Sequence, residues 1–355
     1  MPRVRAQWGG AHAVDLNLSD EEQQLVDAFG ALYAKESSTE RVRAAEPLGH
    51  DAELWARLKE NGALEMAVDE AHGGWGASLL DLTLVAEQHG RYLGSAPLIE
   101  AQVAARLLAR LDTAAARSLL EPAISGARLV TVALHPPARG VLSFVPAGAV
   151  ADDVVFLDGD KVFHAAISDT RSIIKNIGSL PAADINVPAD AVELASGDGA
   201  ARAFDQALDE WMTLVAGALV GMGSRSIEIG VEYVKDRKAF GVPIGSFQAV
   251  SHGLADAATA VEGSLLLTRE AAWSAAVQPE RTPELAALAL GFSAEAAGEA
   301  SYRSLHYHGG YGFMVEYDIQ LYWRRAKAWP GQFGEPDAAF ARAAAHRLAA
   351  IAKEA

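Results

Sequence analysis

The stretch LHYHGGYGFMVEYDIQLYWRRAK, Leu305–Lys327, interrupts two helical patterns near the end of the chain with the glycine-rich sequence HGGYG, residues 308–312. Glycine lets a backbone come close to a ligand, and the free N–H groups of such a turn suit an anion such as a pyrophosphate. Glycine-rich turns also connect helices in proteins that bind nothing there. The stretch alone therefore leaves two alternatives open, a phosphate contact or a simple turn.

A second loop between helical patterns has the sequence DRKAFGVPIGSFQAVSHGLAD, Asp236–Asp256. It places a cation, an aromatic ring and an amide close together, at Arg237, Phe240 and Gln248. Its Gly and Pro residues end one long helix and precede another. Two such loops, each joining long helices, favour a ligand contact over turns that only connect helices.

Hydrophobic periodicity divides the chain into three parts. Helical patterns fill the first part, where Ser19 precedes an acidic turn and is placed as a helix N-cap. Short β-branched runs separated by Pro and Gly follow, and long Ala- and Leu-rich helical patterns then return. We predict a helical domain over residues 1–126, a small β domain over 127–198 and a helical bundle over 199–355.

Composition excludes several function classes. The 355 residues are 50% apolar and carry a net charge of −16, which argues against a nucleic acid or an anionic membrane surface as partner. The chain has no cysteine, and His252, His306 and His308 have no metal-ligand spacing, so we expect neither disulfides nor a metal site. Neither a signal-like apolar core at the start nor a run of about 18 apolar residues is present, which predicts a soluble, cytoplasmic protein without a membrane span.

The two glycine loops resemble motifs of the acyl-CoA dehydrogenase family. That family carries R-x-x-F-G, here Arg237, Phe240 and Gly241, followed by PIGSFQ and, about 70 residues later, by Q-x-x-GG-x-G, here His306-x-x-Gly309-Gly310-x-Gly312. The segments LSDEEQQLVDAF, LWARLKENGAL, DEAHGGWGASLLDLTLVAEQHGR and RRAK extend the resemblance over most of the chain. The resemblance implies a mainly α fold with a helical N-terminal domain, a small β-barrel-like middle domain and a C-terminal four-helix bundle.

The resemblance also implies a cofactor and partners. Family members bind FAD at a subunit interface and desaturate an acyl-CoA thioester, passing the electrons to an electron-transferring flavoprotein. The chain is then expected in a homo-oligomer or in an α2β2 assembly with a paralogous subunit. The residues implied to contact a neighbour's FAD are Arg237, Phe240, Gln248, His306, Gly309 and Gly310.

Two departures from the family concern the cofactor site. His306 stands where the family has glutamine, and both side chains can donate a hydrogen bond to phosphate. The β region is shorter than in the family and lacks its flavin-lining strand motif. This departure predicts a weakened flavin site on the chain's own side.

A third departure concerns the carboxylate that removes the α-proton. Many family members place it nine residues after the start of the RRAK-type motif, which here is Phe333, with Glu335 two residues on. Others place it on the helix before R-x-x-F-G, where a gapless count reaches Trp211, with Glu210 next to it. We take Glu210 as the first candidate base, with a pKa raised by burial, and Glu335 as the second. The alternatives are a solvated helix face for Glu210 and a loop position for Glu335.

Two functional hypotheses follow. The chain is either a catalytic acyl-CoA dehydrogenase subunit or a structural partner that completes the FAD site of a catalytic paralogue. The reduced β region and the missing base favour the partner, while the retained R-x-x-F-G and HGG motifs fit both. The remaining glycine-rich segment, AHGGWG at residues 71–76, lacks the Lys and Ser/Thr of a P-loop, so we interpret it as an interhelical turn near the substrate entrance.

Overall fold

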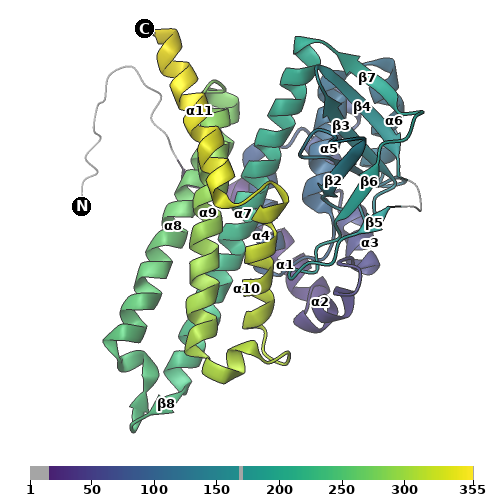
Figure 1. The fold of residues 1–355 in the computed structure, drawn as a ribbon. Coiled ribbons are helices and arrows are strands. Elements are labelled where there is room, and N and C mark those ends of the chain that lie inside the picture. The colour runs from purple at the N-terminus through teal and green to yellow at the C-terminus, as the bar shows by residue number, and fades with distance from the viewer. Residues whose placement is uncertain (1–15, 168–170, 355) are drawn as a thin grey trace.

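A computed structural model describes residues 16–167 and 171–354. Figure 1 shows the long helices of the C-terminal half side by side as a bundle, with the strands gathered beside one end of it. The secondary structure changes close to the predicted boundaries, because the last N-terminal helix ends at Ile124 and the long helix α7 begins at Asp198. The division into domains remains a prediction.

Helices form the N-terminal part, as the sequence predicts. The first begins with a capping box, in which the Ser19 hydroxyl accepts a hydrogen bond from the Glu22 N–H and the Glu22 carboxylate accepts one from the Ser19 N–H. The helices of this part are α1 (Asp20–Glu36), α2 (Thr39–Ala45), α3 (Ala52–Glu60), α4 (Leu79–Arg91), α5 (Leu98–Leu111) and α6 (Ala114–Ile124), with single 3-10 turns η1 (Glu65–Ala67) and η2 (Glu70–His72) between α3 and α4.

Two small sheets make up the β region. The four-stranded sheet has the order β1-β3-β4-β7, with β1 parallel to β3 and the other neighbours antiparallel. The three-stranded sheet has the order β2-β6-β5 and is antiparallel. The strands are β1 (Val130–Val132), β2 (Val141–Val145), β3 (Asp153–Asp158), β4 (Lys161–Ala166), β5 (Ser172–Ile173), β6 (Ala183–Asn186) and β7 (Val192–Ser196).

The C-terminal helices include three long ones. Gly221 allows α7 and α4 to pack closely, because a Cβ there would lie 1.9 Å from the Glu87 carbonyl oxygen. Among the described residues α7 alone is long and apolar enough to cross a bilayer, and 67% of its most apolar window is buried in the protein, as in a core helix. The helices are α7 (Asp198–Asp236), α8 (Gln248–Val277), α9 (Thr282–Tyr307), α10 (Ile319–Ala328) and α11 (Pro336–Glu354).

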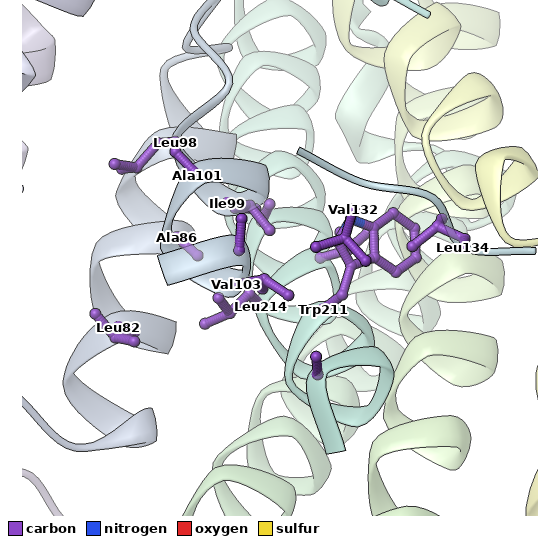
Figure 2. Close-up of a cluster of buried hydrophobic side chains, with 14 of the residues drawn as sticks. Leu82, Ala86, Leu98, Ile99, Ala101, Val103, Val132, Leu134, Trp211 and Leu214 are labelled. Atoms are coloured by element: carbon purple, nitrogen blue, oxygen red, sulfur yellow. The ribbon is translucent and has the colours of Figure 1, made fainter. Parts of the chain in front are cut away.

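The hydrophobic core joins the three parts of the chain around α7. Figure 2 shows Val132 and Leu134, from β1 and the loop after it, beside the indole of Trp211, with Ile99 and Val103 of α5 nearby. Trp211 is the largest fully buried side chain among the described residues. Because α5, α7 and β1 meet here, the residues that line this junction are held by all three parts.

The RRAK segment ends α10, and its two arginines lie in different surroundings. Arg325 is buried, and its guanidinium donates to the carbonyl of Leu93 at 2.6 Å and to the hydroxyl of Ser95 at 3.2 Å. Burial lowers the pKa of Arg325 to about 10. Its neighbour Arg324 pairs with Glu46 and donates to the carbonyl of Ile177. The segment therefore ties the bundle to the N-terminal helices and to the β region.

Candidate functional site

The R-x-x-F-G motif forms an exposed hairpin at one end of the bundle. Arg237 caps the end of α7, and β8 (Lys238–Ala239) pairs with β9 (Val242–Pro243). The two turn residues have positive φ, 53° at Phe240 and 83° at Gly241, as a type I′ turn requires. The Phe240 side chain is 96% exposed. Phe240 thus has a strained backbone and an exposed aromatic ring at the tip of a hairpin. Such a residue suits a contact with another molecule.

The HGGYG segment is a turn that does not lead directly into a helix. It forms the 3-10 turn η4 (Gly309–Phe313), and the next helix begins only at Ile319. Gly309 has a positive φ of 60°, which explains a glycine there. At Gly310 φ is not in that region, and an added Cβ would meet nothing within 4 Å. The chain itself therefore does not require a glycine at 310, whereas a molecule that lies against the backbone would.

A cavity of about 510 Å³ brings Arg237 together with the HGGYG segment. The ring of His308 stacks on Tyr233 at 3.9 Å between centroids, and Tyr311 stacks on Tyr317 at 5.4 Å. Burial lowers the pKa of His308, so its imidazole is neutral near pH 7. The cavity thus combines one guanidinium with an aromatic wall, and the HGGYG segment contributes His308 and Tyr311 to it. The carboxylates of Glu232 and Asp236 also line it.

The other predicted cofactor contacts lie outside this cavity. Phe240, Gln248 and His306 are exposed and are not among its lining residues. Phe240 packs edge-to-face on Phe247, with 6.3 Å between ring centroids, and the His306 ring lies beside Tyr302. Of the predicted contacts, only Arg237 lines the cavity, and Gly309 and Gly310 lie in sequence between its lining residues His308 and Tyr311. All six contacts stay predictions.

Glu210 lies in an environment that differs from both sequence interpretations. It is buried, not solvated, and its Oε1 lies 2.9 Å from the Arg106 Nη2 and 2.6 Å from the Arg110 Nη2. Burial by itself would raise the pKa of Glu210, but the charges and hydrogen bonds of the two arginines outweigh it and hold the pKa below its usual value. The expectation of a raised pKa was wrong. A carboxylate held in this way is a poor proton acceptor at neutral pH.

Glu335 and the two positions at which the family resemblance places the base lie in different surroundings. Glu335 is exposed, in the loop before α11. The Phe333 ring lies 6.4 Å from that of Trp211 and 5.9 Å from that of His135, measured between centroids. Aromatic side chains therefore meet at both positions where the family resemblance places a carboxylate.

One buried carboxyl, where α5, α7 and β1 meet, is not among the residues predicted from the sequence. Glu100 of α5 lies beside Trp211 and lines a small chamber of about 30 Å³ together with His89, Arg325 and Gln332. Burial raises the pKa of Glu100 to about 7, and burial lowers that of His89 to about 3. The chamber has room for only one or two water molecules. A signal was present in the sequence, because Glu100 interrupts the apolar face of the LIEAQVAARLL helix.

Family models cover most of the chain. The model of the acyl-CoA dehydrogenase N-terminal domain matches residues 19–127, and that of the C-terminal domain matches residues 186–335. The residues between the two matches are the ones that form most of the β region.

Curated proteins and solved structures agree with these matches. The acyl-CoA dehydrogenase IpdE2 of Mycolicibacterium smegmatis is 32% identical over 330 residues, which are 90% of this chain and 96% of that protein. A Tcur3481-Tcur3483 steroid ACAD variant superposes with a TM-score of 0.85 at 27% identity, covering 94% of this chain and 99% of that one. The ChsE4-ChsE5 complex from Mycobacterium tuberculosis gives a TM-score of 0.81 at 26% identity, covering 96% and 98%.

Proposed function

This chain belongs to the acyl-CoA dehydrogenase family, with the predicted mainly α fold, and we propose that it is a subunit of an oligomeric FAD-dependent acyl-CoA dehydrogenase. In this proposal a neighbouring subunit binds most of the FAD. The end of this chain's bundle that carries Arg237 and the HGGYG turn contacts that FAD as well. The assembly desaturates an acyl-CoA thioester between Cα and Cβ and passes electrons to an electron-transferring flavoprotein.

The observation that carries the proposal is the cavity that Arg237 lines together with His308 and Tyr311 of the HGGYG segment. Arg237 is exposed, so its guanidinium can pair with an anion without first giving up a buried partner. The open space above Gly309 and Gly310 would let a pyrophosphate approach their backbone. An exposed phosphate-binding edge of this kind is complete only when another chain supplies the rest of the site.

The chemistry supplied by FAD in such an enzyme is acceptance of a hydride from the substrate's β-carbon. The protein must provide a carboxylate that removes the α-proton. In this chain Glu210 is paired with two arginines and Glu335 is exposed in a loop. Neither carboxylate lies in surroundings that would suit it to remove the α-proton.

A second candidate function is the non-catalytic partner, which completes the FAD site of a catalytic paralogue. The ring contacts of His135, Phe333 and Trp211 favour it, because Phe333 and Trp211 occupy both positions at which the family resemblance places the base. The adjoining chamber, at about 30 Å³, is too small for a thioester. The names of two similar structures describe pairs of different subunits, which is compatible with this role.

We expect the purified protein to be an oligomer, alone or with a paralogous subunit. Phe240 at the hairpin tip, Phe313 and Val315 are 96%, 67% and 70% exposed, and burying such side chains stabilises an interface. Light scattering after size exclusion at micromolar concentration measures the mass. A species of 37.4 kDa, both alone and after co-expression with a paralogue, would refute the shared-site proposal.

Replacing Arg237 with alanine is expected to weaken FAD retention by the assembly about 10- to 100-fold. A guanidinium that pairs with a phosphate contributes on the order of 1.5–3 kcal/mol, and this contribution would be lost. The measurement is the flavin absorbance retained after dialysis, compared with Arg57→Ala, which alters an exposed arginine of α3. Equal flavin content in both variants would show that Arg237 does not contact the cofactor.

A further inference from the structure

A cleft on the N-terminal helices is unrelated to the proposed FAD contact. It has a volume of about 310 Å³ and lies between the C-terminal half of α5 and the loop that follows η1. One rim contains Gly76, the last residue of the AHGGWG segment. That segment is tightly packed, because a Cβ at Gly74 would lie 2.1 Å from the carbonyl oxygen of Val68. The close packing at Gly74 fixes the segment that carries Gly76 at the rim.

Two arginines on successive turns of α5 form the charged side of the cleft. Arg106 donates to the carbonyl of Ala67 at 3.1 Å, and Arg110 donates to that of Ala203 at 3.2 Å, so both guanidinium groups are held in place. Both also reach the same Glu210 oxygen. Their side chains remain 20% and 26% exposed. Two cations that share one carboxylate leave one positive charge unpaired on this side of the cleft, while the Asp69 carboxylate at the rim is paired with His72.

The remaining lining residues set the polarity of the cleft. His72 and Asp69 lie at the rim and bond to each other, with 2.6 Å between Nδ1 and Oδ1. The apolar part of the wall is formed by Ala67, Val68, Ala77 and Ala109. A ligand that fits both sides has an anionic group for the guanidinium pair and a small apolar body for the alanines and the valine.

We propose that this cleft binds a small organic acid as its carboxylate, with the carboxylate on Arg106 and Arg110 and the apolar body against Ala109. The volume lies at the lower end of the range for small-molecule sites, which suits an acid of short to medium length. Planar guanidinium groups match carboxylates in geometry. The apolar wall disfavours inorganic phosphate, which has no group to place there. The site is separate from the proposed FAD contact and does not depend on it.

The test is a titration of the full-length protein, in its native oligomer, with hexanoate at pH 7 and low salt, followed by calorimetry. Hexan-1-ol and inorganic phosphate are the probes that lack the charge and the apolar body, respectively. We expect saturable binding of hexanoate and binding at least about tenfold weaker for the other two. Equal affinity for phosphate, or for hexanol, would overturn the assignment.

Two substitutions that are expected to change hexanoate affinity in opposite directions make the test more specific. Arg110→Gln is expected to weaken hexanoate binding about tenfold, since a charge-assisted hydrogen bond is lost, whereas Glu210→Gln removes the competing carboxylate and is expected to strengthen it. Arg57→Gln, at an exposed position of α3, is the matched control. If either variant fails to fold, Ala109→Leu fills the apolar side without altering the ion pairs and is expected to abolish binding. Retained binding in Ala109→Leu, or weaker binding in Glu210→Gln, refutes the proposal.

Discussion

Replacing Glu210 with alanine is expected to lower the free energy of unfolding by about 3 kcal/mol. The substitution leaves Arg106 and Arg110 without their carboxylate in a largely buried place, and removing one member of a buried ion pair costs about 3–5 kcal/mol. The lower end applies because both arginines keep some contact with water. Urea unfolding at one fixed protein concentration measures the change.

A matched surface pair controls for the loss of a carboxylate as such. Glu60 lies 2.6 Å from Arg57 on α3, and both side chains are more than half exposed, so Glu60→Ala should cost about 0–1 kcal/mol. Converting Arg106, Arg110 and Glu210 together to apolar residues of similar size should restore most of the stability, because no charge is then left unpaired. If Glu210→Ala costs no more than Glu60→Ala, the two arginines do not depend on Glu210.

The same position also separates the structural and catalytic roles of Glu210. In an assembly that turns over an acyl-CoA, a base at Glu210 would make Glu210→Gln at least about a hundredfold slower in flavin reduction. The observed ion pairs instead predict a loss of stability with turnover retained. A hundredfold loss of turnover in a variant of unchanged stability would restore Glu210 as the base.

Replacing Glu100 with glutamine is expected to remove a pH-dependent loss of stability. The fold raises the pKa of Glu100 from 4.5 to about 7, so the protonated form is favoured in the folded state. Below about pH 4.5 Glu100 is protonated in both the folded and the unfolded chain and does not lower the free energy of unfolding. As the pH rises from there to about 7, the unfolded chain ionises first, and the free energy of unfolding falls. A shift of this size corresponds to about 3 kcal/mol in total, and Glu100→Gln should gain about 2.5 kcal/mol over the wild type between pH 5 and pH 8.

Comparing the variant with the wild type at each pH cancels the titration of groups that the two proteins share. Glu121→Gln, at an exposed position of α6, is the control and should show no such trend. A spectroscopic check is available, because Trp211 lies beside Glu100 and its fluorescence should titrate near pH 7 in the wild type only. A constant difference in stability from pH 5 to pH 8 would show that Glu100 ionises as it does in the unfolded chain.

Local features of the fold could be predicted from the sequence because short segments determine them. Ser19 and Glu22 form their capping box within four residues, and the turn at Phe240 and Gly241 lies where the Gly/Pro loop predicts it. The long helices and the small β region follow from hydrophobic period. Family membership follows as well, because R-x-x-F-G and HGG-x-G are spacings along the chain.

The properties of the charged groups depended on the tertiary structure. Glu210 and Trp211 are neighbours in sequence, but a step of one residue turns the side chain by about 100°, so one meets the arginines of α5 and the other packs beside Phe333. The arginines that lower the pKa of Glu210 come from a helix about 100 residues earlier, and the packing that raises the pKa of Glu100 comes from all three parts of the chain. Helical period assigns a residue to a face, but only the packed structure places the charges opposite that face and decides how much water remains there.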